Sequence, residues 1–172
     1  MDDLDDLSRW SNSPELWEKL GGWHFPYSKR STEHWINSIN NNDMTKQVYA
    51  ISTDEAGLIG TANLINIDWK NRNAFHGMML GDKEHRGKGH AQDTVMTIMR
   101  YAFDELGLNR LDGDMISTNK LSINFYTKRC GWEIEGVKKD WFYRNGEYHD
   151  KIVVGITKEN YRKLIDKTKY WD

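Results

Sequence analysis

The sequence predicts an α+β fold, in which strands joined mostly by hairpins are covered by a few helices. One observation is a set of short strand-like segments separated by turns, including Asn145-Gly146, the favoured two-residue hairpin turn. The other is one strong amphipathic helix, whose apolar stripe is Ala91, Val95, Ile98, Met99, Ala102, Phe103 and Leu106. The 172 residues contain no repeat and no linker, so we expect a single domain over residues 1–172.

The N-terminal half predicts helices followed by strands. Leu4, Leu7 and Trp10 are spaced for one helix face, and Ser13-Pro14-Glu15 is typical of a new helix start with proline in its first turn. A loop at 21–28 leads to a second helical region near 32–39. Strands are then expected at 47–52, 58–67 and 74–80, with a turn at 54–57 between the first two.

The C-terminal half predicts the amphipathic helix, ended by Gly107, and then alternating elements. We expect a strand at 110–115, a short helix at about 120–129 and a strand at 132–137. A terminal hairpin follows, with strands at 141–144 and 148–156.

Composition excludes several classes of protein. The net charge of −2 gives no reason to expect a nucleic-acid partner, and no apolar run approaches the roughly 18–20 residues of a membrane span. The acidic start of the chain lacks the apolar core of a signal peptide, and one cysteine suits a reducing compartment, so we expect a cytoplasmic protein. Cys130, beside Gly131-Trp132, is interpreted as a buried small side chain.

Aromatic residues are abundant, with eight tryptophans and eight tyrosines. They can serve as large anchors of the core. They can also line an aromatic substrate pocket, because several lie outside the periodic segments. The sequence leaves both interpretations open.

Residues 84–91 lie between a predicted strand and the long helix and contain Gly87 and Gly89. Glycines there let backbone N–H groups turn inward, and the helix N-terminus adds partial positive charge, so the loop predicts an anion site. An ordinary strand-to-helix turn explains the glycines equally well. A Walker A loop does not fit, because His90-Ala91 follow Gly89, and the dinucleotide fingerprint would need a glycine where Gln92 stands.

Three motifs in the same order resemble the GNAT superfamily of N-acetyltransferases. Its pyrophosphate loop, [QR]-x-x-G-x-[GA], is matched by Arg86-Gly87-Lys88-Gly89-His90-Ala91. Its N-x-x-[SA]-x-x-x-Y helix is matched from Asn119 to Tyr126, and its G-[FW]-x-x-x-G by Gly131 to Gly136. The resemblance covers about 47–156 and is closest to the branch of ribosomal-protein and spermidine acetyltransferases. One residue more than usual separates Tyr126 from Gly131, which affects the end of that helix.

The resemblance implies a mixed, largely antiparallel central sheet flanked by helices. The family has a strand before the first helix and this sequence opens directly at that helix, so we expect either a sheet without its first edge strand or a native start upstream of Met1. The resemblance also implies acetyl-CoA as co-substrate and no metal. Arg86, Gly87, Lys88, Gly89, His90 and Ala91 would bind the pyrophosphate, and Met78, Met79, Leu80 and Asn119 the pantetheine arm. Tyr126 would protonate the leaving thiolate after direct attack by a primary amine of a small molecule or peptide. A homodimer is common in this branch.

The general base and the acceptor pocket are less well defined. His76 is a candidate base, although a histidine here can simply face the other side of the sheet; Glu33 and a water chain are alternatives. For acceptor contacts we expect Trp23, His24, Phe25, Tyr27 and Glu33 near the first helices, and Trp141, Phe142 and Tyr143 on the terminal hairpin. These aromatics can also simply bury one another. A non-catalytic acyl-CoA sensor is the alternative function.

Overall fold

Six strands form one sheet in the order β1-β2-β3-β4-β6-β5. The structure, a computed structural model, describes residues 3–22, 25–40 and 42–172. The strands are β1 (Lys46–Thr53), β2 (Gly57–Asp68), β3 (Asn73–Leu80), β4 (Arg110–Ile116), β5 (Glu133–Arg144) and β6 (Glu147–Thr157). All neighbours are antiparallel except β3 and β4, so the predicted mixed, largely antiparallel sheet is confirmed.

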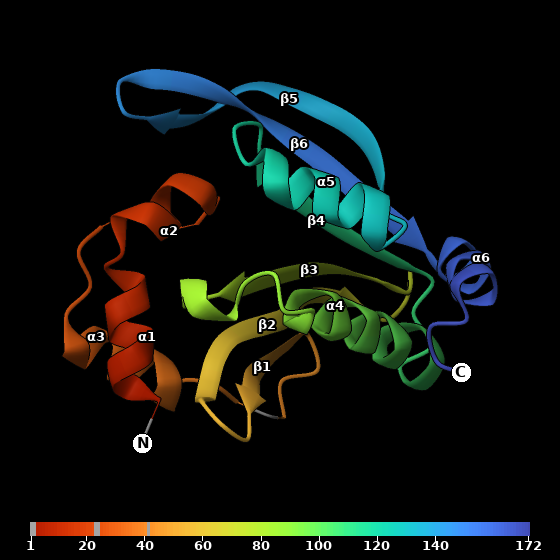
Figure 1. The fold of residues 1–172 in the computed structure, drawn as a ribbon, viewed down its shortest axis with the longest axis horizontal. Helices are drawn as coiled ribbons and strands as arrows, with labels where there is room; N and C mark the ends of the chain where they lie inside the picture. Colours follow the sequence, from red (N-terminus) through yellow and green to blue (C-terminus); the bar gives the residue numbers. More distant parts are fainter. Residues whose placement is uncertain (1–2, 23–24, 41) are drawn as a thin grey trace.

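The helices surround this sheet (Figure 1). In the described residues no strand precedes the first helix, and β1 is the edge strand. The helical elements are α1 (Leu4–Ser11), α2 (Pro14–Lys19), α3 (Lys29–Asn37), the 3-10 turn η1 (Lys83–His85), α4 (His90–Arg100), its π-helical continuation η2 (Tyr101–Glu105), α5 (Lys120–Arg129) and α6 (Lys158–Thr168).

Two apolar cores hold the layers together. The larger one packs the stripe of α4 and η2, from Val95 to Phe103, against the sheet together with α5, α6 and Trp132. The smaller one lies among the N-terminal helices and contains Leu7, Trp10, Leu16 and Leu58. Cys130 is fully buried in the larger core, as expected of a small apolar side chain, and burial raises the pKa of its thiol to about 12.

The long amphipathic helix is confirmed as α4 and η2, and Gly107 follows it with φ 67°. The helix expected at 32–39 instead spans Lys29–Asn37, because the side chain of Ser28 caps it by accepting a hydrogen bond from the Ser31 amide at 3.0 Å. No prediction covered α6. Its signals are the cap at Thr157 and the apolar spacing of Tyr161, Leu164 and Ile165.

The two strands expected at 132–137 and 141–144 form one continuous strand, β5. Its register with β6 shifts between Lys138 and Phe142, where Asp140 has φ 50°. Asp150 of β6 bridges this irregularity by accepting hydrogen bonds from the Asp140 amide and the Lys139 ammonium. The Asn145-Gly146 turn is confirmed, with positive φ at both residues.

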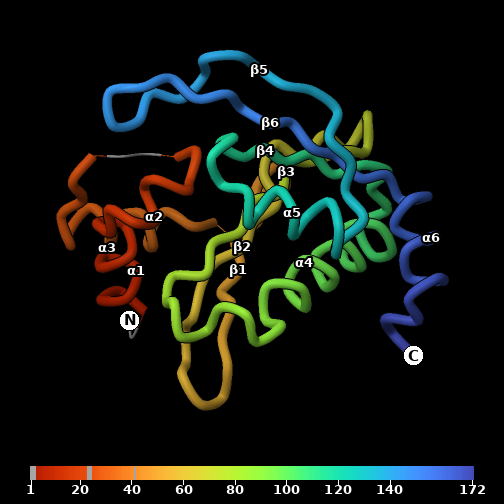
Figure 2. Tube along the Cα trace, turned by 45° about the horizontal axis from the view of Figure 1, so that its top comes forward, coloured from red at the N-terminus to blue at the C-terminus, as the bar shows by residue number. Residues whose placement is uncertain are grey.

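The hairpin β5–β6 extends beyond the rest of the sheet and its tip lies over α2 in both views (Figures 1 and 2). The Arg144 guanidinium donates a hydrogen bond to the Leu20 carbonyl at 3.2 Å. This contact brings together the two regions in which the sequence predicted acceptor contacts. Among the described helices, none is long and apolar enough to cross a membrane.

Candidate active site

The site begins where β3 and β4 separate. The two strands pair in parallel only from Asn73 to Phe75 on β3 and from Arg110 to Asp112 on β4. Beyond that point β3 continues with β2 as its partner and β4 continues with β6. Figure 1 shows the two halves of the sheet diverging toward α2. Backbone groups of β3 beyond residue 75 are therefore not paired with β4 and are left for a ligand.

A cleft of about 530 Å³ opens from this split. It is bounded by α2, the end of β3, the loop before α4, and α5. The side chains and backbone that line it include Leu16, Lys19, Leu20, Met78, Met79, Leu80, Arg86, Gly87, Gly89, Ala91, Asn119, Leu121, Ser122, Phe125, Lys128 and Arg129. The walls of the cleft are mostly apolar, and its cationic groups are those of Lys19, Arg86, Lys128 and Arg129.

The glycine loop forms one end of the cleft. Gly87 and Gly89 have φ values of 78° and 94°, a backbone conformation that residues with a Cβ rarely adopt. Gly89 is the N-cap of α4, and no side chain caps this helix. The first N–H groups of α4 therefore lack a partner within the helix and present partial positive charge. This arrangement can hold the phosphates of a nucleotide.

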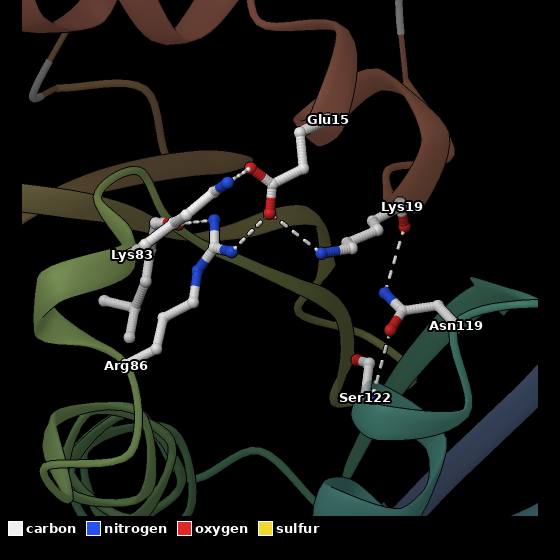
Figure 3. A network of polar contacts seen from close by, with 7 residues as sticks. Glu15, Lys19, Lys83, Arg86, Asn119 and Ser122 are labelled. Carbon is white, nitrogen blue, oxygen red and sulfur yellow. Dashed lines mark hydrogen bonds and ion pairs between the residues drawn. The ribbon is translucent and has the colours of Figure 1, made fainter.

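Arg86, which begins the loop, is held by Glu15 of α2. The Glu15 carboxylate lies 2.8 Å from Arg86, 2.7 Å from Lys83 and 3.0 Å from Lys19 (Figure 3). Hydrogen bonds from Lys83, then Arg86 and Lys19, lower the pKa of Glu15 to about 2. The carboxylate is thus ionised at neutral pH. It forms ion pairs with the same cationic side chains that a bound phosphate would contact.

Asn119 lies at the mouth of the cleft and is the N-cap of α5. Its side-chain oxygen accepts a hydrogen bond from the Ser122 amide, and its amide nitrogen donates to the Lys19 carbonyl at 3.1 Å (Figure 3). Its backbone is not helical, and α5 begins at the next residue. Asn119 lines the cleft, whereas Tyr126 is buried, and Phe125 lines the cleft in its neighbourhood.

His76 and Tyr126 form a buried pair at the base of the split. The Tyr126 hydroxyl lies 3.1 Å from His76 Nε2, and His76 Nδ1 lies 3.0 Å from the Asn63 carbonyl oxygen. A carbonyl only accepts, so Nδ1 carries the proton and the neutral ring accepts from Tyr126 at Nε2. Trp132 packs edge-on against Tyr126 at 5.2 Å, and Phe125 does so from the cleft side at the same distance.

Burial lowers the pKa of His76 to about 4, which keeps the ring neutral at physiological pH. Burial also raises the pKa of the Tyr126 phenol. Both ring nitrogens of His76 are bound, and neither His76 nor Tyr126 is among the residues that line the cleft. The structure therefore places both predicted catalytic residues together, next to the β3 backbone at Gly77 and Met78.

The predicted acceptor residues differ in their surroundings. Tyr27 faces a second, smaller cavity beside the cleft. Phe25, Trp141 and Tyr143 are exposed, and Trp141 packs against the ammonium groups of Lys138 and Lys151 at 4.8 and 4.4 Å. Glu33 is half-buried on α3, Phe142 is buried at the foot of the hairpin tip, and Trp23 and His24 lie outside the described residues.

Several residues of the site were missed by the sequence interpretation. Leu16 and Lys19 of α2 and Leu20 directly after it line the cleft, and Glu15 of α2 pairs with Lys83 of η1 beside it, only because α2 folds back over the loop. The sequence indicates only the local part of this arrangement, because Glu15 and Lys19 are one helical turn apart and can pair. Arg86, the partner of Glu15 in the loop, is 71 residues away. In the described part of the chain, no group of three or more His, Cys, Asp or Glu side chains is arranged to hold a metal ion.

The split sheet, the uncapped helix behind two glycines and the largely apolar cleft form a site that can hold a phosphate-bearing ligand with an extended apolar arm. Comparison with known proteins agrees. Residues 1–133 match the acetyltransferase (GNAT) domain family. The chain belongs to this family and is an N-acetyltransferase.

Two relatives and one solved structure are similar to this chain. The putative ribosomal N-acetyltransferase YdaF of Bacillus subtilis is 30% identical over 150 residues, which cover 84% of this chain and 81% of the relative. The spermidine N(1)-acetyltransferase of Vibrio cholerae is 27% identical over 120 residues, covering 70% and 68%. A crystal structure of the Vibrio cholerae spermidine N-acetyltransferase with CoA and spermine has a TM-score of 0.80 at 25% identity and covers 94% of this chain and 93% of the other.

The buried His76 predicts a pH-dependent stability. A histidine has a pKa of about 6.5 when unfolded, so between about pH 6.5 and 4 the unfolded chain binds more protons than the folded one. As the pH falls through this window, protonation of His76 in the unfolded chain should lower the free energy of unfolding by about 3 kcal/mol. Urea titrations of the wild type and His76→Gln from pH 7 to 4 measure it. Parallel pH profiles of the two proteins would contradict a buried neutral histidine.

The Glu15 carboxylate predicts competition with the cofactor's phosphates. Replacing Glu15 by glutamine removes a negative charge that faces Arg86 and Lys83, so Glu15→Gln should bind acetyl-CoA several-fold more tightly. Calorimetric titration gives the dissociation constant. Glu18→Gln, on the same helix with Asn145 as its nearest partner at 3.5 Å, is the matched control and should bind as the wild type does. Weaker binding by Glu15→Gln alone would show that Glu15 positions Arg86 for the phosphates.

Proposed function

We propose that this N-acetyltransferase uses acetyl-CoA and transfers its acetyl group directly to a primary amine. The amine lone pair attacks the thioester carbon, the new C–N bond forms as the C–S bond breaks, and the CoA thiolate leaves with the bonding electrons. The amine loses one proton and the thiolate gains one. No covalent enzyme intermediate is required, which agrees with the burial of Cys130 and the raised pKa of its thiol.

The observation that carries this proposal is the cleft between the parted strands and α5, closed by the glycine loop. In the proposed complex the N–H groups at Gly87, Gly89 and the first turn of α4 hold the pyrophosphate. Arg86, Lys88, His90 and Ala91 complete this loop. Arg86 would exchange part of its contact with Glu15 for a phosphate oxygen.

The pantetheine arm would lie along Met78, Met79 and Leu80, whose backbone has no strand partner on the β4 side. A backbone N–H of this segment is well placed to stabilise negative charge on the thioester oxygen. Asn119 would release the Lys19 carbonyl and bind the arm instead. The non-catalytic alternative receives no support from the relatives described above, which are named as acetyltransferases.

Tyr126 is the proposed general acid, and His76 the residue that positions it. The Tyr126 proton points at His76 Nε2 and would turn to the thiolate as charge develops there. The proton released by the ammonium then restores the phenol. A role of His76 as a base would also run through the Tyr126 hydroxyl, because its other nitrogen is bound to the Asn63 carbonyl.

The acceptor is proposed to enter from the side of α1–α3 and the hairpin tip, where Phe25, Tyr27, Glu33, Trp141 and Tyr143 lie, with Trp23 in the same loop. Relatives of this chain are named for two kinds of amine, spermidine and the alanine of ribosomal protein uS5. Both support a primary amine as the acceptor class.

We also propose that residues 1–172 form one acetyltransferase domain that works in the cytoplasm as a homodimer. The described strands form one sheet, and the single cysteine suits a reducing compartment. The edge strand β5 exposes Ile134, Val137 and Trp141, an apolar surface that a second copy would cover. Light scattering should return twice the 20.2 kDa mass of one chain, and a monomer at micromolar concentration would rule the dimer out.

The role of Tyr126 is tested by Tyr126→Phe in a thiol-release assay with acetyl-CoA and a panel of primary amines. Loss of the proton donor should lower kcat at least about tenfold and leave the affinity for acetyl-CoA nearly unchanged. Tyr161→Phe is the matched control, because Tyr161 is also fully buried and its hydroxyl accepts a hydrogen bond from Trp171 outside the cleft. Equal kcat values for Tyr126→Phe and the wild type would remove Tyr126 from the acid role.

A further inference from the structure

A second cavity of about 250 Å³ lies beside the acetyl-CoA cleft. Leu20 and Met79 line both spaces, so the two meet at these side chains. The remaining walls come from α1, α2, α3, β2 and the loop before α3, and comprise Leu7, Trp10, Ser11, Trp17, Tyr27, Trp35 and Thr61. The proposed function uses only Tyr27 of this group.

Contacts within the protein hold two of its indole rings and the backbone of Tyr27. The Trp10 indole lies against Gly81, where an added Cβ would come within 1.9 Å of the ring, and its Nε1 donates to Asp82 at 3.3 Å. Trp17 Nε1 donates to the Ser11 carbonyl at 2.8 Å. The backbone N–H and C=O of Tyr27 both bond to the Asn12 side chain. The cavity is therefore built in advance of any ligand.

The described residues that line this cavity carry no charge. Among the described residues that line the cavity there is no carboxylate and no cationic side chain. The carboxylate of Asp82, which accepts the hydrogen bond from Trp10 Nε1, does not line the cavity and is paired with Arg9 at 3.1 Å. A ligand in this cavity meets aromatic rings, aliphatic groups and the hydroxyls of Ser11 and Thr61.

We propose that this cavity selects the acceptor, and that the acceptor is a primary monoamine with an aromatic or branched apolar body. The body would fill the space between Trp10, Trp17 and Trp35, and the amino group would lie at the junction by Leu20 and Met79, facing the thioester. This inference rests on the proposed function, because it needs acetyl-CoA in the neighbouring cleft.

Desolvation explains why a single amino group suits this cavity. An apolar surrounding lowers the pKa of an ammonium and favours the neutral amine, which is the form that attacks the thioester. The cavity therefore assists deprotonation without a carboxylate beside the nitrogen. A second ammonium of a polyamine would find no counter-charge among the described residues that line the cavity, and attraction to the aromatic faces compensates only part of its loss of hydration.

The size of the cavity agrees with such a ligand. A cavity of roughly 150 Å³ lined by apolar side chains can hold a benzene molecule. The additional volume here accommodates a two-carbon arm that carries the amino group to the junction. A polar peptide backbone would leave its hydrogen-bonding groups unpaired in most of this space.

The first experiment compares amines that differ in one feature, using thiol release by the full chain with acetyl-CoA. Pentylamine and 1,5-diaminopentane differ by one terminal ammonium, and pentylamine should have the higher kcat/KM by about 100-fold. The value for 2-phenylethylamine should be higher still, and that for spermidine as low as the diamine's. Equal or faster turnover of the diamine or of spermidine would overturn this inference and leave the proposed function standing. No turnover of any amine would overturn both.

The second experiment fills the cavity from β2. Thr61→Leu adds volume at the wall, whereas Thr61→Val keeps the volume and serves as the matched control. Thr61→Leu should raise KM for 2-phenylethylamine at least about tenfold, with the acetyl-CoA dissociation constant and the thermal midpoint close to those of Thr61→Val. An unchanged KM in a folded Thr61→Leu protein would show that the cavity is a packing defect of the smaller core and does not bind the acceptor.

Discussion

The early separation of β3 from β4 is the constraint on which the rest of the molecule depends. Parallel pairing stops after Phe75 and Asp112, so one half of the sheet continues with β2 and the other with β6. The space between them must be filled, because unpaired backbone and apolar side chains would otherwise face water. Helix α5 fills the inner part through Ile123, Tyr126 and Cys130, and the cleft occupies the outer part. The site is thus the part of the split that the protein's own core does not close.

Two polar groupings connect this split to the rest of the fold. At its base the Tyr126–His76–Asn63 chain of hydrogen bonds ties α5 to β3 and β2 and fixes the histidine tautomer. At its mouth Glu15 and Lys19 tie α2 to the glycine loop and to Asn119 (Figure 3). Helix α2 also supplies Leu20 to the cleft and Trp17 and Leu20 to the smaller cavity. A movement of α2 would therefore change both the cleft and the smaller cavity, which are the two ligand sites of the proposed reaction. This connection is a physical basis for ordered binding of the two ligands.

Much of this could be predicted from the sequence where the signal is local. The stripe of α4, the Asn145-Gly146 turn and the glycines at 87 and 89 each encode their conformation within a few residues, and the structure has them as expected. The continuous β5 was missed because Asp150, far along β6, stabilises its irregularity. Glu15 and the cavity walls Trp10, Trp17 and Trp35 were missed for the same reason. Their partners are distant in the chain, and the abundance of tryptophan alone did not say which of them line a space.

The central claim is that acetyl-CoA binds in the split with its phosphates on the glycine loop. The most direct measurement is a calorimetric titration of acetyl-CoA into the wild type and into Gly89→Val. Gly89 has φ 94°, so a β-branched residue there would distort the loop that presents the amides, whereas a Cβ added at this position would meet no atom within 4 Å beyond the adjacent backbone. The claim predicts that the wild type binds and that the variant, although folded, binds at least about 100-fold more weakly. Equal affinity of the two proteins would contradict it.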